Sequence, residues 1–432
     1  MTHSFLVVVI DFYNVRMTGQ KARLRIDFLF QKNILVKGST YKNREMITKI
    51  FINTLFQRRW FWMWLIFQYV LTACHSPSSH HTNRLEPDSS AVIQYAKGFA
   101  IDYFKDYERL TVYNPWKPND IAATYYLIQK SGVKTPDLAS TILIPVHDVA
   151  VTSSTHVAFI QALNELSTIT GMTTPELVYS PSFQQRFQDG KIINLGDAYH
   201  INVEKVLLLH PQFIMMTNYN QVNIGDDQLN KVGIRVVYNN EWKESTPLGR
   251  AEWIKFIAAF YNRGRMADSL FNALVVNYNR LTALAAKAAS KPSVLIGDSF
   301  KGTWYMPSGT GYMGHFLKDA GCTYYFSRDT TNGSIAMHFE SVFDHFQNAQ
   351  FWLNSSASSL KALKNSDPRY ALFKSFQNHR VYSLNGRVTP QGGNDFWEGA
   401  VIHPDSLLRD YIRVLHPELL PNVPLIYLLQ LK

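Results

Sequence analysis

The chain has very little cysteine: Cys74 and Cys322 are the only two among its 432 residues. No disulfide can form if Cys74 is acylated. Cys322 lies in the segment AGCTYYF, and we interpret it as a small buried apolar residue.

Signatures of several enzyme classes are also missing. The sequence has no Gly-x-x-x-x-Gly-Lys-Ser/Thr motif, and the glycines of SGTGYMG are not followed by lysine, so we do not expect a phosphate-binding loop. Neither Gly-x-Ser-x-Gly nor His-Glu-x-x-His occurs, which leaves a hydrolase or a zinc protease without support.

One short segment combines a basic and an apolar part. Arg58 to Cys74 reads RRWFWMWLIFQYVLTAC, with an apolar run of 14 residues from Trp60 to Ala73. That run is too short for a helix to cross a hydrocarbon core about 30 Å thick, but it suits the apolar core of a signal peptide. The segment resembles a bacterial lipoprotein signal peptide, which is cut before a cysteine that then receives the lipid. If the segment is a lipoprotein signal peptide, Cys74 is lipidated and the protein is a membrane-anchored lipoprotein of the periplasm. The alternative is a buried helix that ends in cysteine.

The residues around this segment divide the N-terminal part of the chain. A leader that began at Met1 would exceed the usual length of about 15–30 residues, whereas Met46 gives a normal one. Our hypothesis is that residues 1–45 are a misassigned extension, residues 46–73 the signal peptide and residues 74–90 a flexible tether. The pair His80-His81 lies in that tether and supplies too few ligands for a zinc site.

The net charge of +10 comes mostly from the leader. Residues 1–73 hold 11 of the 43 Lys and Arg but only 3 of the 33 Asp and Glu, so the rest of the chain has a net charge of +2. It also has no basic run, and we therefore do not expect nucleic acid as a partner. Its roughly 350 residues exceed one compact core and predict two lobes.

From residue 91 onward, short β-branched runs alternate with helical stretches, which predicts an α/β fold with mostly parallel sheets flanked by helices. The candidate strands are Thr141–Pro145, Val149–Ser153, Phe213–Thr217, Arg235–Tyr238, Ser293–Gly297 and Gln350–Leu353. The candidate helices are Val157–Leu166, Val203–Leu209, Gly311–Ala320 and Glu340–Phe346.

A longer helix is predicted between residues 264 and 290. Its apolar residues recur every three to four positions; they are Met266, Leu270, Leu274, Leu281, Leu284 and Ala288. Such a helix is about 40 Å long and is followed at once by the strand SVLIGD. We expect it to link an N-terminal lobe, residues 91–263, to a C-terminal lobe, residues 291–432; an ordinary long helix packed on one sheet is the alternative.

The two parts of the chain each place a glutamate at the start of a helix that leads into a strand. These are Glu204 in HINVEKVLLLHPQFI and Glu340 in AMHFESVFDHFQNAQFW. A carboxylate is favoured at a helix N-terminus by the helix dipole, so each glutamate by itself is explained as a capping residue.

The order of these segments resembles the lipid-anchored or periplasmic solute-binding proteins that deliver iron-siderophore complexes, haem or vitamin B12 to ABC importers. The resemblance covers residues 141–420 and rests on VAVTSSTHVAFIQAL, NVEKVLLLHPQFIMM, the long helix, GTWYMPSGTGYMGHFLKDAGC and MHFESVFDHFQNAQFWL. It implies two lobes joined by one rigid helix, with the ligand between them. It further implies a monomer without a cofactor, whose Glu204 and Glu340 dock on arginines of the dimeric permease.

The resemblance also places the residues that line the ligand cleft. On the N-terminal lobe they are Ser153, Ser154, Thr155, His156, Tyr179, Tyr199, Asn218, Tyr219 and Asn220. On the C-terminal lobe they are Trp304, Tyr305, Met306, Asn332, Gly333, Ser334 and Trp397. So many aromatic rings suit a large, flat, partly apolar ligand such as a ferric chelate, haem or a corrinoid.

Two other functions stay open. His147, His156, His210, His338 and His345 are candidate ligands for a zinc or manganese carrier of a related importer, but no acidic partner lies at matching positions. A lipid-anchored enzyme on the same scaffold is the second alternative, since fold alone does not decide function. No nucleophile and base can be paired from the sequence, so we expect capture and delivery without catalysis.

Overall fold

The computed structural model describes residues 86–117, 119–197, 200–217, 224–331 and 333–432. The predictions for residues 1–45, for the signal peptide and for Cys74 lie outside these ranges. Residues Leu85–Lys432 form one compact unit. Its first strand, β1 (Ser89–Ser90), pairs with β2, so the ordered fold begins ahead of Ala91, within the predicted tether.

The N-terminal lobe, residues 86–263, starts with a sheet that the sequence reading largely missed. The sheet has the order β1-β2-β3-β4-β5, with β2 (Phe99–Tyr103), β3 (Glu108–Tyr113), β4 (Ile121–Ile128) and β5 (Thr141–Leu143). Neighbours are antiparallel except β4 and β5, which are parallel. Phe99, Ile101, Leu110 and Val112 alternate with more exposed residues and point into the core, as expected for a sheet with one buried face.

The second sheet of this lobe is entirely parallel and has the order β10-β9-β6-β7-β8. Its strands are β6 (Val149–Val151), β7 (Ile169–Met172), β8 (Ile193–Asn194), β9 (Phe213–Met216) and β10 (Val236–Tyr238). The helices α2 (Ser154–Ala162) and α3 (Pro181–Gln188) pack on one face, and α4 (Val203–Leu209) and α5 (Ile224–Lys231) on the other. Helices on both faces explain why β6 and β9 are buried along their whole length.

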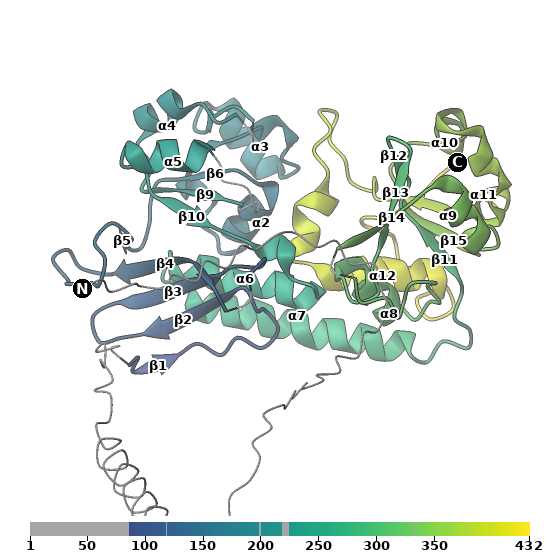
Figure 1. The fold of residues 1–432 in the computed structure, drawn as a ribbon, viewed down its shortest axis with the longest axis horizontal. Coiled ribbons are helices and arrows are strands. Elements are labelled where there is room, and N and C mark those ends of the chain that lie inside the picture. Colours follow the sequence, from purple (N-terminus) through teal and green to yellow (C-terminus); the bar gives the residue numbers. More distant parts are fainter. Residues whose placement is uncertain (1–85, 118, 198–199, 218–223, 332) are drawn as a thin grey trace, which may run out of the picture. The chain divides into compact units, whose positions relative to one another are not determined.

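Two consecutive helices connect the lobes. Almost every residue of α6 (Pro247–Ala259) is buried. The following helix, α7 (Gly264–Ala285), runs along the base of both lobes (Figure 1). Ala267 and Phe271 belong to the N-terminal core and Tyr278, Leu281 and Ala285 to the C-terminal core. The helix ends at Ala285 rather than at Ser290, where only alanine, lysine and serine follow and no large apolar side chain is left to pack.

The C-terminal lobe, residues 291–432, holds a mixed sheet and a small antiparallel one. The mixed sheet has the order β11-β15-β16-β17, with β11 (Val294–Ile296), β15 (Phe351–Ser355) and β16 (Val381–Ser383) parallel and β17 (Leu429–Gln430) antiparallel to β16. The small sheet contains β12 (Ser299–Phe300), β13 (Thr303–Pro307) and β14 (Ser334–Met337). The helices are α8 (Tyr312–Asp319), α9 (Phe339–Phe346), α10 (Leu360–Ser366), α11 (Lys374–Gln377) and α12 (Pro404–Leu415).

The predicted fold class is confirmed: the chain is α/β, with parallel sheets flanked by helices in two lobes. In the part of the chain that the structure describes, no helix combines the length and apolar character needed to span a bilayer.

Candidate functional site

The two lobes touch through a C-terminal segment, residues 384–398, that lies against residues 177–180 of the N-terminal lobe. The Glu398 side chain accepts a 2.6 Å hydrogen bond from the Tyr179 amide and a 3.0 Å bond from the Ser180 amide. At Gly393 the backbones come so close that a Cβ would lie 2.8 Å from the carbonyl oxygen of Leu177. Only glycine fits there, so the contact is built into the sequence of this segment.

Three residues predicted to line the cleft meet at this contact. The Ser154 hydroxyl, in the first turn of α2, donates a 3.1 Å hydrogen bond to the carbonyl oxygen of Trp397. Arg387 Nε donates a 3.1 Å bond to the Tyr179 hydroxyl, and its guanidinium lies 4.9 Å from the centre of the tyrosine ring. The structure therefore brings Ser154, Tyr179 and Trp397 together from opposite lobes.

The carboxylate at this contact has an unusual environment. Glu398 is only 3% exposed, and burial raises its pKa from 4.5 to about 7 despite the two backbone amides that favour the charged form. Nearby, Asp395 pairs with Arg387 at 3.0 Å. The charge at the lobe contact therefore changes near neutral pH.

A cavity of about 500 Å³ also lies between the lobes. From the N-terminal lobe it is lined by residues 242–245, around the short 3₁₀ helix Glu241–Lys243 that follows β10. From the C-terminal lobe it is lined by Pro307, Ser308, Thr310, Gly311, Tyr312, Met313, Thr330, Thr331, Gly333 and Ser334. Its volume lies within the range of about 300–1,000 Å³ typical of ligand pockets.

Aromatic and cationic side chains gather at the N-terminal wall of this cavity. Lys243 Nζ lies 5.0 Å from the ring centre of Trp242 and 5.4 Å from that of Trp116. The two indole rings are 6.4 Å apart and tilted by 58°. Trp242 and Lys243 line the cavity and Trp116 lies behind them, so this wall offers both apolar area and positive charge to a ligand.

The wall formed by Tyr312 is held in place by a buried ion pair. Arg250 Nε lies 3.2 Å from Glu241 Oε2, and its guanidinium lies 5.1 Å from the centre of the Tyr312 ring. Burial raises the pKa of Tyr312, so the phenol stays protonated at neutral pH. Both members of this ion pair belong to the N-terminal lobe, and the Arg250 guanidinium lies over the Tyr312 ring of the C-terminal lobe beside the cavity.

The other predicted cleft residues fall into three groups. Ser153 and Thr155 engage each other at the start of α2, with 2.8 Å between their hydroxyl oxygens. Gly333 and Ser334 line the cavity, whereas Tyr305 is 53% exposed on β13 outside its lining. The residues Tyr199, Asn218, Tyr219, Asn220 and Asn332 lie outside the described ranges.

Three of the predicted cleft residues are buried in this structure. Trp304 and Met306 alternate with Tyr305 along β13, so their side chains point into the C-terminal core. Trp304 is 1% exposed, and its indole N–H donates a 2.9 Å hydrogen bond to the carbonyl oxygen of Ile296. His156 faces the N-terminal core from the buried side of α2, and burial lowers its pKa to about 3. A neutral ring in the core explains this histidine without a ligand.

The sequence reading missed Trp116, Trp242, Lys243 and Tyr312. Trp242 and Lys243 lie in the short 3₁₀ helix after the end of β10. Ligands of open parallel sheets bind beyond the carboxyl ends of strands, so this position could have indicated a binding residue. Trp116 lies in the turn between β3 and β4, a part of the first sheet that was not predicted, and its neighbours could not be inferred.

The two predicted docking glutamates are exposed in the first turns of α4 and α9. The Glu340 carboxylate is 76% exposed and accepts a 3.0 Å hydrogen bond from Arg369, whose guanidinium also bonds Asp367 at 2.7 Å. The Arg369 guanidinium lies 4.0 Å from the centre of the Phe339 ring. A partner that engages Glu340 must therefore share it with Arg369 or displace that arginine.

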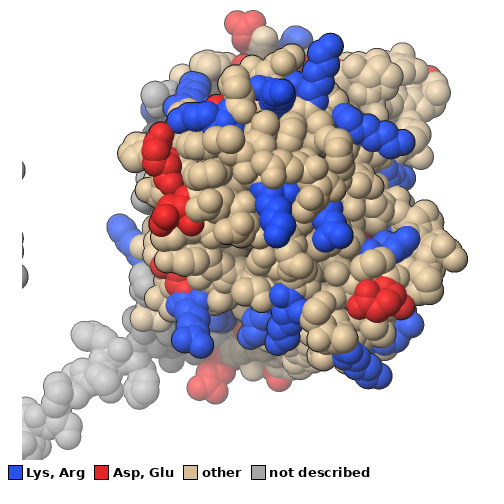
Figure 2. Space-filling view, turned by 90° about the vertical axis from the view of Figure 1, so that its right-hand side faces the viewer, with Lys and Arg blue, Asp and Glu red and all other residues tan. Residues whose placement is uncertain are grey.

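Basic side chains on the C-terminal lobe are scattered. Figure 2 shows a face on which Lys and Arg are separated by uncharged residues and form no continuous stripe. Several acidic residues of this lobe are buried, among them Asp395, Glu398 and Asp410, which leaves more of the exposed charge to lysine and arginine. Within the described ranges, no group of three or more His, Cys, Asp or Glu side chains is placed to hold a metal ion.

Comparisons with known proteins identify what this architecture resembles. A family profile described as "Periplasmic binding protein" matches residues 149–388, more than half of the chain. Two uncharacterized lipoproteins of Methanocaldococcus jannaschii are similar to this chain. The first is 26% identical, and the match covers 77% of this chain and 84% of the relative. The second is 23% identical, and the match covers 69% of this chain and 78% of the relative. The crystal structure of a periplasmic heme binding protein from Pseudomonas aeruginosa aligns with a TM-score of 0.51 and 17% identity, over 66% of this chain and 98% of that one. This last likeness shows a shared fold.

Proposed function

The chain belongs to the periplasmic binding protein family, and on that premise we propose that it is the substrate-binding lipoprotein of an ABC importer. It captures an iron chelate, either a siderophore complex or haem, or a corrinoid, between its two lobes and delivers it to the membrane permease. Capture and release need no catalysis. The relatives named as lipoproteins support the anchoring of the chain through Cys74.

The observation that carries this proposal is the cavity of about 500 Å³ whose walls come from both lobes. A ligand held there contacts Trp242 and Lys243 on one side and Tyr312 on the other. Its bound state therefore depends on how the lobes are placed, and this lets a permease release the ligand by separating them. The Lys243 ammonium beside two indole rings favours a flat or aryl ligand that carries negative charge, as haem and catecholate chelates do.

The direct test is a titration of the purified chain with haemin, several ferric siderophores and cyanocobalamin, followed by tryptophan fluorescence and checked by calorimetry. We expect one ligand to bind with a dissociation constant below about 1 μM, and Lys243→Gln to weaken it roughly tenfold or more. Lys301→Gln is the matched control, because Lys301 lies 5.3 Å from the Phe300 ring but does not line the cavity.

Two results contradict the proposal. Equal losses in Lys243→Gln and Lys301→Gln would place the ligand elsewhere. No binding across the panel, together with stoichiometric zinc or manganese in the purified chain, would instead support the metal-ion carrier.

A further inference from the structure

A second cavity, of about 300 Å³, lies between helices α2, α6 and α7 and the start of α12. It shares no lining residue with the cavity at Trp242. Ala162 and Ile254 come from the N-terminal lobe, and Ile402, His403 and Asp405 from the C-terminal lobe. The cavity is therefore a distinct space at the level of the linking helix.

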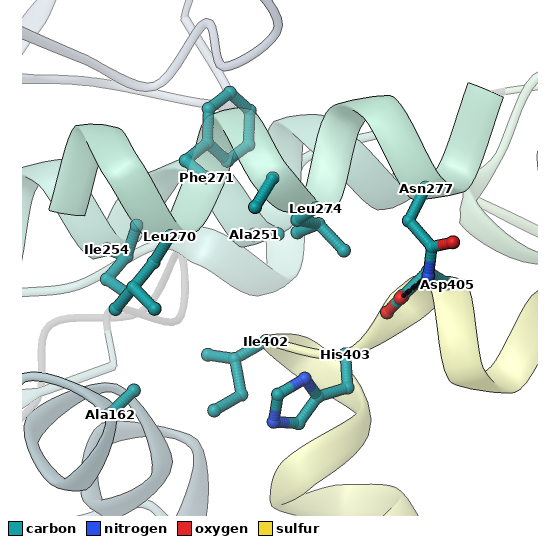
Figure 3. Close-up of a pocket in the computed structure, with 11 residues that line it drawn as sticks. Ala162, Ala251, Ile254, Leu270, Phe271, Leu274, Asn277, Ile402, His403 and Asp405 are labelled. Carbon is teal, nitrogen blue, oxygen red and sulfur yellow. Dashed lines mark hydrogen bonds between the residues drawn. The ribbon is translucent and has the colours of Figure 1, made fainter. Parts of the chain in front are cut away.

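Most of its wall is apolar. Figure 3 shows Ile254, Leu270 and Ile402 pointing into the same space, with Phe271 and Leu274 on α7 above them. The remaining apolar positions are alanines, at residues 162, 251 and 273, and their small side chains leave the space open. An apolar wall of this size suits the hydrocarbon part of a small molecule.

One end of the cavity is polar. Figure 3 shows His403, Asn277 and Asp405 grouped at that end, with the Asn277 amide donating a hydrogen bond to Asp405 Oδ2. The second carboxylate oxygen, Oδ1, is buried and has no hydrogen-bond partner among the residues described. That oxygen is closed to solvent, so a ligand in the cavity does not reach it directly. The negative charge of the carboxylate still acts on a cation in the cavity, because Asp405 lines its wall.

We propose that this cavity binds a small organic cation, an aryl- or alkylammonium, with its hydrocarbon body against Ile254, Leu270 and Ile402 and its ammonium group at Asp405. The carboxylate selects for positive charge, and the apolar walls select against ions that are fully hydrated. The volume is at the lower end of the range for ligand pockets, which limits the ligand to about one ring or a short chain. Because both lobes supply the walls, a bound cation contacts both of them beside α7.

The test uses benzylammonium as the probe and benzyl alcohol as its neutral counterpart, titrated into the purified full chain by calorimetry and by ligand-observed NMR. We expect saturable binding of benzylammonium with a dissociation constant of about 1 mM or below, as suits eight non-hydrogen atoms. Benzyl alcohol should bind roughly tenfold more weakly, because it carries no positive charge to interact with the Asp405 carboxylate.

Two variants test the apolar wall and the Asp405 carboxylate separately. Ala162→Phe adds a ring to the wall of the cavity and should abolish binding of both probes. Asp405→Asn keeps the size of the side chain and an acceptor for Asn277, and it should weaken benzylammonium roughly tenfold while changing benzyl alcohol less than about twofold. Asp344→Asn, at a carboxylate that is 78% exposed on α9, is the matched control and should change neither.

The proposal is overturned if benzylammonium shows no saturable binding to the wild-type chain, or if Asp405→Asn binds both probes as the wild type does. If Ala162→Phe fails to fold, as judged by circular dichroism, the Asp405→Asn comparison decides alone. None of these outcomes depends on whether the larger cavity binds an iron chelate or a corrinoid.

Discussion

At the scale of single residues, three buried carboxylates stabilise segments whose backbone amides have no strand partner. Glu252 is fully buried and accepts hydrogen bonds from the amides of residues 94–96 and from Lys255 Nζ. Asp410 accepts from the amides of residues 426–428, and Glu398 from Tyr179 and Ser180. Bonds to an ionised acceptor are roughly twice as strong as neutral ones, which offsets part of the cost of burying the charge.

Glu398 makes stability depend on pH. Burial raises the pKa of this carboxyl to about 7 from 4.5, its ordinary value in the unfolded chain. The unfolded state therefore releases the proton first as the pH rises. The contribution of Glu398 to the free energy of unfolding is fully present below about pH 4.5 and is lost as the pH rises through about 7.

Glu398→Gln should remove this dependence, because glutamine keeps the size and one acceptor oxygen without a charge. The difference in the free energy of unfolding, wild type minus variant, should fall by on the order of 3 kcal/mol between about pH 4.5 and about pH 8. Denaturant titrations of both proteins at several pH values measure it. A constant difference across that range would show that Glu398 ionises normally in the folded protein.

The same residues show how far the sequence predicts the candidate site. Ser154, Tyr179 and Trp397 were expected at the cleft from the resemblance, and the structure brings them together. Their bonding partners Arg387 and Glu398 were not expected, because neither carries a local pattern that marks a contact across 200 residues of chain. Long-range partners of this kind depend on how the lobes pack.

At the scale of elements, continuous β-branched runs were easier to predict than half-exposed strands. The predicted strands beginning at Val149, Phe213 and Ser293 are confirmed as β6, β9 and β11. The strands β2 to β4 carry polar residues on their open face, such as Asp102 and Arg109, and their alternation was not recognised. A sheet with one face in solvent has a weaker sequence signal than one covered on both faces.

The alternating burial of side chains along β13 can be tested by substitutions at two adjacent residues. Trp304 is 1% exposed, and its ring lies 5.6 Å from that of Trp352, whereas its neighbour Tyr305 is 53% exposed. Trp304→Ala should lower the free energy of unfolding by about 3–5 kcal/mol through loss of apolar contact and a cavity in the core. Tyr305→Ala is the matched control and should cost less than about 1 kcal/mol.

Chemical denaturation of both variants measures this difference. Similar losses at the two positions would mean that β13 does not bury alternate residues. A normal stability for Trp304→Ala, combined with weaker ligand binding, would return Trp304 to the cleft.

At the scale of the whole molecule, α7 belongs to both hydrophobic cores, which restricts how far the lobes can move apart. The linking role of a long helix could be read from its apolar period and from the strand that follows. The contact through residues 384–398 could not, because it depends on Gly393, on the Glu398 bonds and on the packing of a segment whose regular structure is only one short 3₁₀ helix and one isolated bridge.

The two glutamates predicted to dock on the permease, Glu204 and Glu340, can be tested in one double variant. The resemblance implies that these glutamates meet arginines of the permease. Charge reversal of both, Glu204→Arg with Glu340→Arg, should therefore reduce uptake of the transported ligand more than about tenfold through repulsion between like charges. The dissociation constant for the ligand should not change, since neither residue lines the cavity between the lobes. Uptake by cells and calorimetry on the purified chain measure the two quantities.

The matched control reverses two other exposed carboxylates, Asp106→Arg on the N-terminal lobe and Glu418→Arg on the C-terminal lobe. It changes the net charge by the same amount and should leave uptake intact. Equal uptake by the two double variants would remove Glu204 and Glu340 from the docking surface.

The most direct measurement of the central claim is anomalous X-ray diffraction from crystals of the chain grown with whichever ligand binds, collected at the absorption edge of its iron or cobalt. We expect one metal position in the cavity between Trp242 and Gly333, with side chains of both lobes around the ligand. A metal position outside that cavity, on the surface of one lobe alone, would contradict it.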